Sequence, residues 1–253
     1  MARRDVRREP SKPDAPQPRR RKRRWLRGLL IWGVSLALLC VLAIGVAVGM
    51  AARSMPSFNE LKETAAGQTI VVRARDGTEI LTLGPSAGSW LRSDEIPQVM
   101  KDAMVSVEDR RFYSHIGIDP LGLTRALWVS FTGDKRIAAT STITQQLARN
   151  VFLNSNRSFD RKAREAILAM ALEWKFSKEQ ILELYLNKVY FGGGAYGVDA
   201  ASRKFFSHSA RDLNIGEAAI IAGLVKAPSR YSPTADVAAA VKRANVVLQL
   251  MKQ

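Results

Sequence analysis

The chain has 253 residues, a formal net charge of +16 and one cysteine. A single cysteine excludes an intrachain disulfide, so the folded part depends on its hydrophobic core, and about 200 residues are enough for one such domain. The excess of positive charge favours a polyanionic partner, such as a nucleic acid or a phosphate-bearing membrane component.

Positive charge is concentrated at the amino terminus. Residues 1–27 contain twelve Arg or Lys and three Asp or Glu, a net charge of +9. Almost no apolar residue precedes Trp25, so this stretch cannot bury enough surface to fold, and we predict a disordered tail. The basic run Arg19–Arg24 is typical of nucleic-acid binding. The apolar segment that follows instead favours contact with anionic lipid head groups and argues against a nucleic-acid partner.

Residues 28–52 carry no charge and consist mainly of Leu, Ile, Val and Ala. This length suits a helix that spans a bilayer and exceeds the core of a signal peptide. The small residues of Ala47–Ala52 keep a cleaved signal peptide as the alternative. Because basic residues precede the span and few follow it, we expect a cytoplasmic amino terminus and an outer location for everything after Arg53.

Residues 53–93 are predicted to form a connector and a β-hairpin, followed by a helical domain over residues 94–253. The hairpin strands flank Asp76-Gly77, a dipeptide that favours tight hairpin turns. Pro97 suits the opening of the first domain helix. Apolar residues then recur at helical spacing up to Val107 and place Glu108 on or beside a buried face.

Burial at this face raises the pKa of the Glu108 carboxyl towards the range of a general base. Three further candidate site residues are expected within two helical turns of Glu108: Asp109, Phe112 and His115. For an isolated Glu-Asp pair, a salt-bridged helix end is the more common explanation. The segments that follow favour a site.

The segment 118–131 is strongly apolar and has basic neighbours, including Arg125 and Lys135. Large apolar residues beside basic ones suit a surface that rests in the membrane interface. A buried core helix explains the same residues, and the sequence leaves both alternatives open.

Thr142 and Gln145 have the spacing of a capping box, which predicts a helix that starts near Thr142. Apolar residues share one face of this helix, and the other carries Gln146, Arg149 and Asn150. The polar face is either simply solvated or, with hydroxyls and free N–H groups at the helix start, a site for an anion.

The next helix, Asp160–Trp174, carries a carboxylate towards the interior because Glu165 shares a stripe with Ala169 and Leu172. Lys162 lies one turn before Glu165, so Arg161, Lys162 and Glu165 also fit ordinary surface ion pairs. Further helices are expected over residues 178–187, from about 218 and from about 235. The glycine-rich stretch 192–197 requires a loop with unusual backbone angles.

In this order, five motifs resemble those of the peptidoglycan glycosyltransferases, family 51, and they cover about residues 94–233. The motifs are Glu108–Gly117, Ser141–Asn150, Arg161–Glu165, Glu183–Gly197 and Glu217–Ser229. With the hairpin and the apolar span, the chain is similar to the amino-terminal half of a bifunctional class A penicillin-binding protein.

The resemblance implies a mainly α fold, with a lysozyme-like lobe and a smaller lobe near the membrane. It implies a single-pass protein of the bacterial cytoplasmic (inner) membrane that polymerises lipid II. The growing glycan on a polyprenyl pyrophosphate is the donor, and the 4-hydroxyl of lipid II attacks with inversion. Membrane lipids, transpeptidases and other cell-wall synthesis proteins are the partners to expect.

The resemblance also assigns roles to matched positions. Glu108 is the base, and Glu165 lies near the leaving pyrophosphate. No cofactor is required; a divalent cation, Mg²⁺ or Mn²⁺, bridging Glu165 and the pyrophosphate is the one candidate. The remaining matched residues bind substrate or support the base: Asp109, Phe112, His115, Ser141, Thr142, Gln145, Gln146, Arg149, Asn150, Arg161 and Lys162.

Two positions depart from the family pattern, namely Ala139, where Gly is usual, and Arg149, where Lys is more frequent. No serine motif of a transpeptidase domain occurs up to Gln253, so we expect glycosyl transfer without transpeptidation. Two alternatives stay open: a truncated, inactive membrane scaffold, and a lysozyme-like enzyme that cleaves finished glycan.

Overall fold

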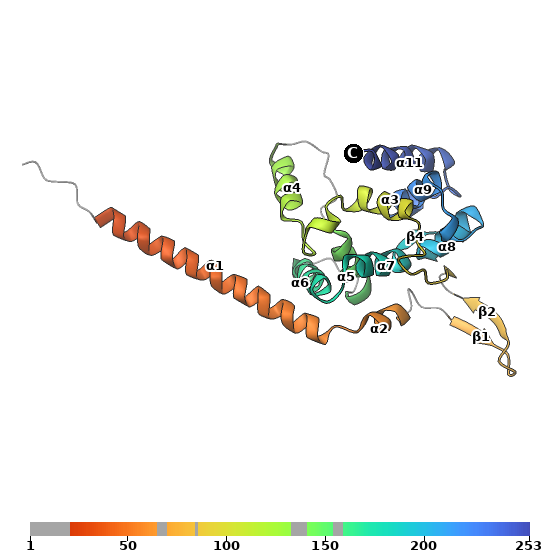
Figure 1. Ribbon diagram of the computed structural model, residues 1–253, viewed down its shortest axis with the longest axis horizontal. Helices are drawn as coiled ribbons and strands as arrows, with labels where there is room; N and C mark the ends of the chain where they lie inside the picture. Colours follow the sequence, from red (N-terminus) through yellow and green to blue (C-terminus); the bar gives the residue numbers. More distant parts are fainter. Residues whose placement is uncertain (1–20, 65–69, 84–85, 133–140, 154–158) are drawn as a thin grey trace, which may run out of the picture. The chain divides into compact units, whose positions relative to one another are not determined.

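The structure is a computed structural model that describes residues 21–64, 70–83, 86–132, 141–153 and 159–253. The chain forms two units, Met1–Gly45 and Val46–Gln253. Helices account for most of the described residues, and the strands are short (Figure 1). The prediction of a mainly α protein with a β-hairpin and one apolar amino-terminal helix is confirmed.

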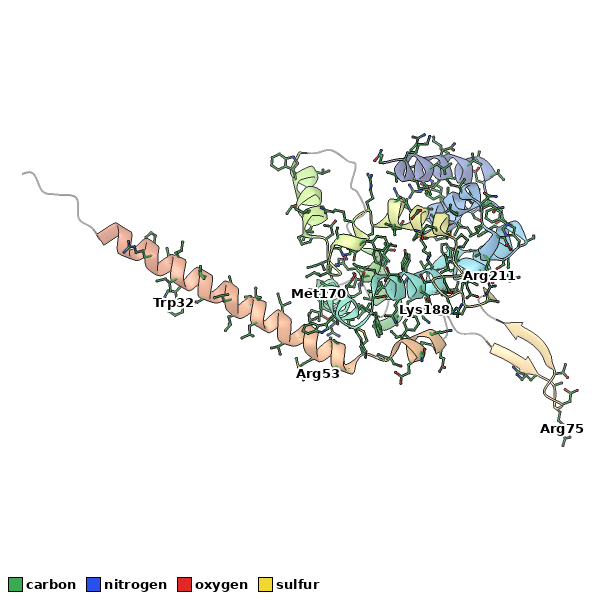
Figure 2. The ribbon with its side chains drawn as sticks, viewed as in Figure 1. Trp32, Arg53, Arg75, Met170, Lys188 and Arg211 are labelled. Atoms are coloured by element: carbon green, nitrogen blue, oxygen red, sulfur yellow. The ribbon has the colours of Figure 1, made fainter. Side chains whose placement is uncertain are left out.

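Helix α1 (Arg21–Ser54) contains the apolar segment. Within it, Arg27–Ser54 is long and apolar enough, by length and composition, to cross a membrane. Its apolar side chains are largely exposed, as Figure 2 shows for Trp32, which is 78% exposed. The predicted span 28–52 lies inside this helix, whereas most of the predicted tail lies outside the described residues.

The second unit holds the remaining helices. They are α2 (Phe58–Glu63), α3 (Gln98–Glu108), α4 (Pro120–Thr132), α5 (Ile143–Phe152), α6 (Phe159–Lys175), α7 (Lys178–Lys188), α8 (Val198–Phe206), α9 (Ile215–Leu224), α10 (Pro228–Tyr231) and α11 (Val237–Met251), with 3₁₀ turns η1 (Phe112–Ser114) and η2 (Ala210–Asp212). The capping box predicted at Thr142 is formed, and Asn214 forms an equivalent box with Glu217, which explains why α5 and α9 begin where they do.

The predicted hairpin is present as β1 (Ile70–Arg73) paired antiparallel with β2 (Glu79–Leu83). Ile70 lies opposite Leu83, and the register shifts by one residue near Arg73. Gly77 has a φ of 88°, the left-handed region that the turn requires and that glycine adopts without strain.

A second sheet was not predicted. Strand β5 (Ala195–Tyr196) pairs in parallel with β3 (Ser86–Ala87) and antiparallel with β4 (Tyr190–Gly192). Strands this short show no alternation in the sequence, so only their glycine-rich turn was recognisable. Gly192, Gly193, Gly194 and Gly197 all have positive φ, as the composition of this loop predicted.

Two groups of helices build the core. Helices α3, α9 and α11 pack against one another, and α5 packs against α6 and α7 (Figure 1). Their facing side chains are fully buried and include Met100, Met104, Leu147, Leu172 and Ile221. The candidate site lies where the end of α3 meets the start of α5.

The expectation that Glu108, Asp109, Phe112 and His115 lie within two helical turns is wrong. Helix α3 ends at Glu108, and Asp109 adopts a φ of −159°. The chain leaves the helix here because the Asp109 side chain bonds to the start of α5. Phe112 then lies in η1, and His115 is extended.

Candidate active site

Glu108 is a partly buried carboxylate at the last position of α3. Gln146 on α5 donates from Nε2 to its Oε2 at 2.9 Å. Burial raises the pKa of Glu108, as predicted from its helical position. The Gln146 hydrogen bond and the charges of Arg243 and Lys226 act in the opposite direction, and the charge of Asp109 adds to the rise. The carboxyl therefore has the character expected of a general base.

Asp109 links the end of α3 to the start of α5. Its Oδ2 accepts the backbone N–H of Ile143, the first residue of α5, at 3.0 Å. This contact satisfies one of the free N–H groups of the helix start with a negative charge. The same oxygen lies 2.8 Å from Nε2 of His115, and both side chains are buried.

His115 adopts a defined tautomer. Nδ1 accepts the backbone N–H of Gly117 at 3.1 Å, so this nitrogen carries no proton. Nε2 then carries the proton and donates it to Asp109. Asp109 thus receives two donors, which holds its carboxylate beside Glu108 in one orientation.

Phe112, the first residue of η1, is fully buried. The Lys178 ammonium group lies 4.5 Å from the Phe112 ring centroid and donates to the His115 backbone oxygen at 2.8 Å. Lys178 also pairs with Glu173 at 2.7 Å, and Glu173 accepts the Thr144 hydroxyl. This network joins α5, α6 and α7 to the His115 turn.

The start of α5 is bound at several points. Thr142 and Gln145 cap each other, and the Thr142 hydroxyl donates to the Gly117 backbone oxygen at 2.6 Å. Gly117 has a φ of 94°, and a Cβ there would lie 2.6 Å from the backbone oxygen of Ala169 on α6. Only glycine allows this close approach, so the turn after His115 lies directly against the α6 backbone.

A second charged cluster lies on α6. Glu165 is fully buried, as its predicted stripe with Ala169 and Leu172 required. Its two oxygens lie 3.2 Å from Arg161 Nε and 2.9 Å from Lys162 Nζ. Lys162 also donates to the Ser141 hydroxyl at 2.8 Å and keeps 46% of its side chain exposed. These ion pairs hold an ammonium group at the border of the buried cluster.

Among the described residues, side chains of the protein alone do not form a metal site around Glu165. Its nearest charged partners are the cations Arg161 and Lys162. Over the described ranges, no group of three or more His, Cys, Asp or Glu side chains converges in a way that suits a metal ion. Divalent cations prefer several oxygen ligands, so a cation bound at Glu165 would need further oxygens from the pyrophosphate of the substrate.

Helix α5 connects the two clusters. Gln146 contacts Glu108, Thr142 contacts the Gly117 turn, and Ser141 before the helix contacts Lys162. Arg149 is partly buried, and Asn150 is exposed, one turn beyond these contacts. Ala139 lies outside the described residues.

Three residues near Glu108 were not predicted. Tyr185 on α7 is fully buried and donates to Oε1 of Gln146 at 3.0 Å. Lys226, which follows α9, and Arg243 on α11 carry positive charges that act to lower the pKa of Glu108. Tyr185 belongs to the fourth motif, but a tyrosine among apolar helix residues gives no sequence signal beyond burial.

Helix α4 has exposed apolar side chains. Leu121 is 65%, Leu123 55% and Trp128 71% exposed. A core helix would bury them, so these residues favour the membrane-interface alternative. The side chains of 125–127 and 130–132 are not described.

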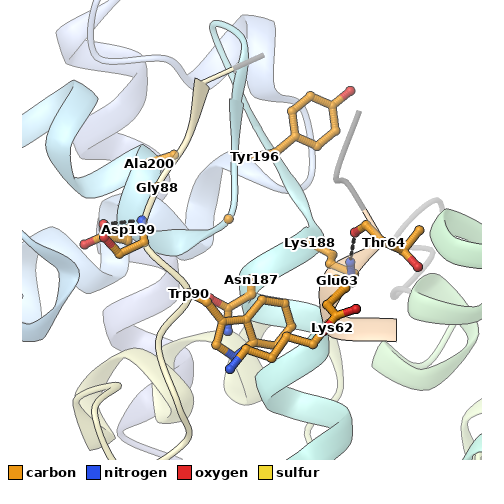
Figure 3. Close-up of a pocket in the computed structure, with 12 residues that line it drawn as sticks. Lys62, Glu63, Thr64, Gly88, Trp90, Asn187, Lys188, Tyr196, Asp199 and Ala200 are labelled. Atoms are coloured by element: carbon orange, nitrogen blue, oxygen red, sulfur yellow. Dashed lines mark hydrogen bonds between the residues drawn. The ribbon is translucent and has the colours of Figure 1, made fainter. Parts of the chain in front are cut away.

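A small cavity of about 190 Å³ lies elsewhere, at the carboxyl end of α7 (Figure 3). Lys188 donates there to the Thr64 backbone oxygen, and its ammonium group lies 5.7 Å from the Trp90 ring centroid. Burial lowers the pKa of Lys188. The lining contains none of the predicted site residues.

Comparison with known proteins gives matches over most of this chain. A family model described as Transglycosylase matches residues 76–252. The chain is 38% identical over 228 residues to penicillin-binding protein 1A of Vibrio cholerae, covering 90% of this chain and 28% of that protein. It is 42% identical over 217 residues to penicillin-binding protein 1A of Haemophilus influenzae, covering 86% and 24%.

With penicillin-binding protein 1A of Escherichia coli the identity is 42% over 197 residues, covering 78% of this chain and 23% of that protein. A crystal structure of the Haemophilus influenzae protein covers 73% of this chain and 18% of its own, at 25% identity and a TM-score of 0.39. The chain thus spans about a quarter of the length of these relatives.

Proposed function

Because the chain belongs to the transglycosylase family, we propose that it is a peptidoglycan glycosyltransferase that polymerises lipid II into glycan strands. The observation that carries the proposal is a desolvated carboxylate, Glu108, joined through α5 to the Arg161, Lys162 and Glu165 cluster. One group suits proton removal and the other suits a phosphate leaving group.

In the proposed reaction, Glu108 takes the proton from the 4-hydroxyl of lipid II. That oxygen forms a bond to the anomeric carbon of the donor sugar with inversion. The bond from this carbon to the phosphate oxygen breaks, and the lipid pyrophosphate leaves with the electron pair. Lys162 and Arg161 stabilise the charge that develops on the phosphate, and Glu165 holds both cations in place.

The proposed setting is the bacterial cytoplasmic membrane. Helix α1 would span it once, with the basic amino-terminal end in the cytoplasm and the second unit outside. The exposed apolar residues of α4 support contact with the bilayer surface, where a lipid-linked substrate is found. Partnership with transpeptidases or other cell-wall synthesis proteins belongs to the same proposal.

The direct test is polymerisation of purified lipid II by the full chain, with Glu108→Gln alongside. Glutamine keeps the shape of the side chain but cannot accept the proton, so polymerisation should fall roughly 100-fold or more. Glu63→Gln, at an exposed position of α2, is the matched control and should leave the rate unchanged.

Near-normal activity of Glu108→Gln would remove this residue from the role of base. A folded wild type that makes no polymer would favour the inactive scaffold. Shorter glycans released from finished cell wall would instead favour the lysozyme-like cleaving enzyme.

A further inference from the structure

Tyr185 is fully buried, and its hydroxyl is linked to the candidate base, Glu108, through the side-chain amide of Gln146. The hydroxyl donates to Oε1 of Gln146 at 3.0 Å, and Nε2 of the same amide donates to Glu108 at 2.9 Å. Gln146 is only 8% exposed, so both bonds are shielded from water. The three side chains come from α7, α5 and α3 and form one directed chain of hydrogen bonds.

The direction of this chain matters because an amide has a donor end and an acceptor end. With Nε2 towards Glu108, the amide stabilises the ionised carboxylate. With Oε1 towards Glu108, it would instead stabilise the protonated acid. The orientation of Gln146 therefore selects between the active and the inactive form of the base.

Tyr185 favours the first orientation. Burial raises the pKa of Tyr185 well above its ordinary value, with the charge of Glu108 adding to the rise, so the hydroxyl keeps its proton. If the amide turned round, that proton would face an NH₂ group. In the described part of the chain the Tyr185 hydroxyl has no acceptor besides Gln146. A buried hydroxyl without an acceptor is unfavourable.

We propose that Tyr185 is a positioning residue for the glycosyl transfer: its hydroxyl fixes the Gln146 amide so that Nε2 faces Glu108 and holds the base ionised and correctly oriented. The inference rests on the proposed function and adds a residue that never touches substrate.

Other charges face Glu108 and must stay constant in any test. Arg243 on α11 and Lys226 after α9 favour its ionised form, and neighbouring Asp109 opposes it. The charge of Arg149 on α5 acts to lower the pKa of Tyr185. A Tyr185→Phe substitution leaves all four in place, fills the same volume and removes only the donor.

The test is the pH dependence of lipid II polymerisation by the full chain in detergent, for wild type and Tyr185→Phe. The amide is then free to turn, and the acidic limb of the kcat profile should move to higher pH. Turnover should fall roughly tenfold at the acidic end, approach the wild-type value at the alkaline end, and leave KM unchanged. Tyr190→Phe removes a hydroxyl that accepts the Gly194 N–H and is the matched control, with an unaltered profile.

A double-mutant cycle adds a second criterion. If Tyr185 acts through Gln146, Tyr185→Phe should cost little further activity in a Gln146→Leu background. Additive losses, or an equal loss of turnover at every pH, would overturn the proposal and leave Tyr185 with a packing role only.

Infrared difference spectroscopy separates this inference from the proposed function. The protonated carboxyl band of Glu108, assigned by its loss in Glu108→Gln, should persist to higher pH in Tyr185→Phe than in wild type. An unchanged titration would refute the Tyr185 role. A wild type that makes no polymer would reject only the proposed function, because the band still reports the ionisation of Glu108.

Discussion

At the scale of the residue, the placement of Glu108 has a cost in stability. Its folded pKa is raised by burial, so between the unfolded and folded values the native state binds more protons than the unfolded chain. Stability contributed by this group is therefore present below about pH 4.5 and is lost as pH rises through the folded pKa.

Glu108→Gln removes this titration, so the variant should be more stable than wild type at pH 7.5, and the difference should shrink as the pH approaches 4.5. A gain of about 1 kcal/mol corresponds to a midpoint roughly 2–4 °C higher. Thermal unfolding in one detergent at both pH values measures it. A pH-independent difference would mean that Glu108 is not desolvated in the folded state.

The sequence predicted this residue better than its surroundings. Helical spacing was enough to place Glu108 and Glu165 at buried faces, because periodicity reports burial. It did not indicate Tyr185, Lys226 or Arg243, since their relation to Glu108 depends on how α7, α9 and α11 pack. Contacts across such distances in the chain have no local signature.

At the scale of the element, α5 is the helix on which the site depends. Thr142→Ala removes its cap and should lower stability by about 1 kcal/mol. It should also reduce polymerisation, because the first turn of α5 bonds to Asp109 and Gly117. Thr142→Ser keeps the cap and should restore both.

Ser57→Ala removes an equivalent capping box from α2, away from the site, and provides the control. It should lower stability at most to a similar degree without altering turnover per folded molecule. Equal turnover in Thr142→Ala and Ser57→Ala would show that α5 only supports the fold.

Elements with strong local signals were predicted correctly, namely the capped helices and the Asp76-Gly77 hairpin. The sheet around β5 was missed because its strands are two or three residues long and one pairing is parallel. The end of α3 was also missed, because it is set by the contact between Asp109 and Ile143 across 34 positions of the chain.

At the scale of the whole molecule, the end of α1 belongs to the second unit. Val48 is 5% exposed, and Lys175 donates to the Met55 backbone oxygen. Hydropathy alone cannot separate such burial from exposure to lipid, so the predicted span included Val48. Removal of residues 1–45 should therefore give a more stable domain than removal of 1–52, by about 1–2 kcal/mol from the loss of Val48 packing.

Both truncated forms should still bind lipid vesicles through α4. Flotation with anionic vesicles measures this, and the combined change Leu121→Ser, Leu123→Ser and Trp128→Ser should weaken it. Truncated protein that stays unbound, or identical midpoints of the two forms in thermal unfolding, would contradict these expectations.

Gly117 has a consequence for how such a site evolves. The turn after His115 meets α6 through main-chain atoms, with no side chain in between. Side-chain substitutions nearby therefore leave the distance between the first motif and the helix that carries Glu165 unchanged. Substitutions around Gly117 can alter the rate or the substrate preference while this backbone contact is kept. Any replacement of Gly117 itself should displace Glu108 and Glu165 relative to each other.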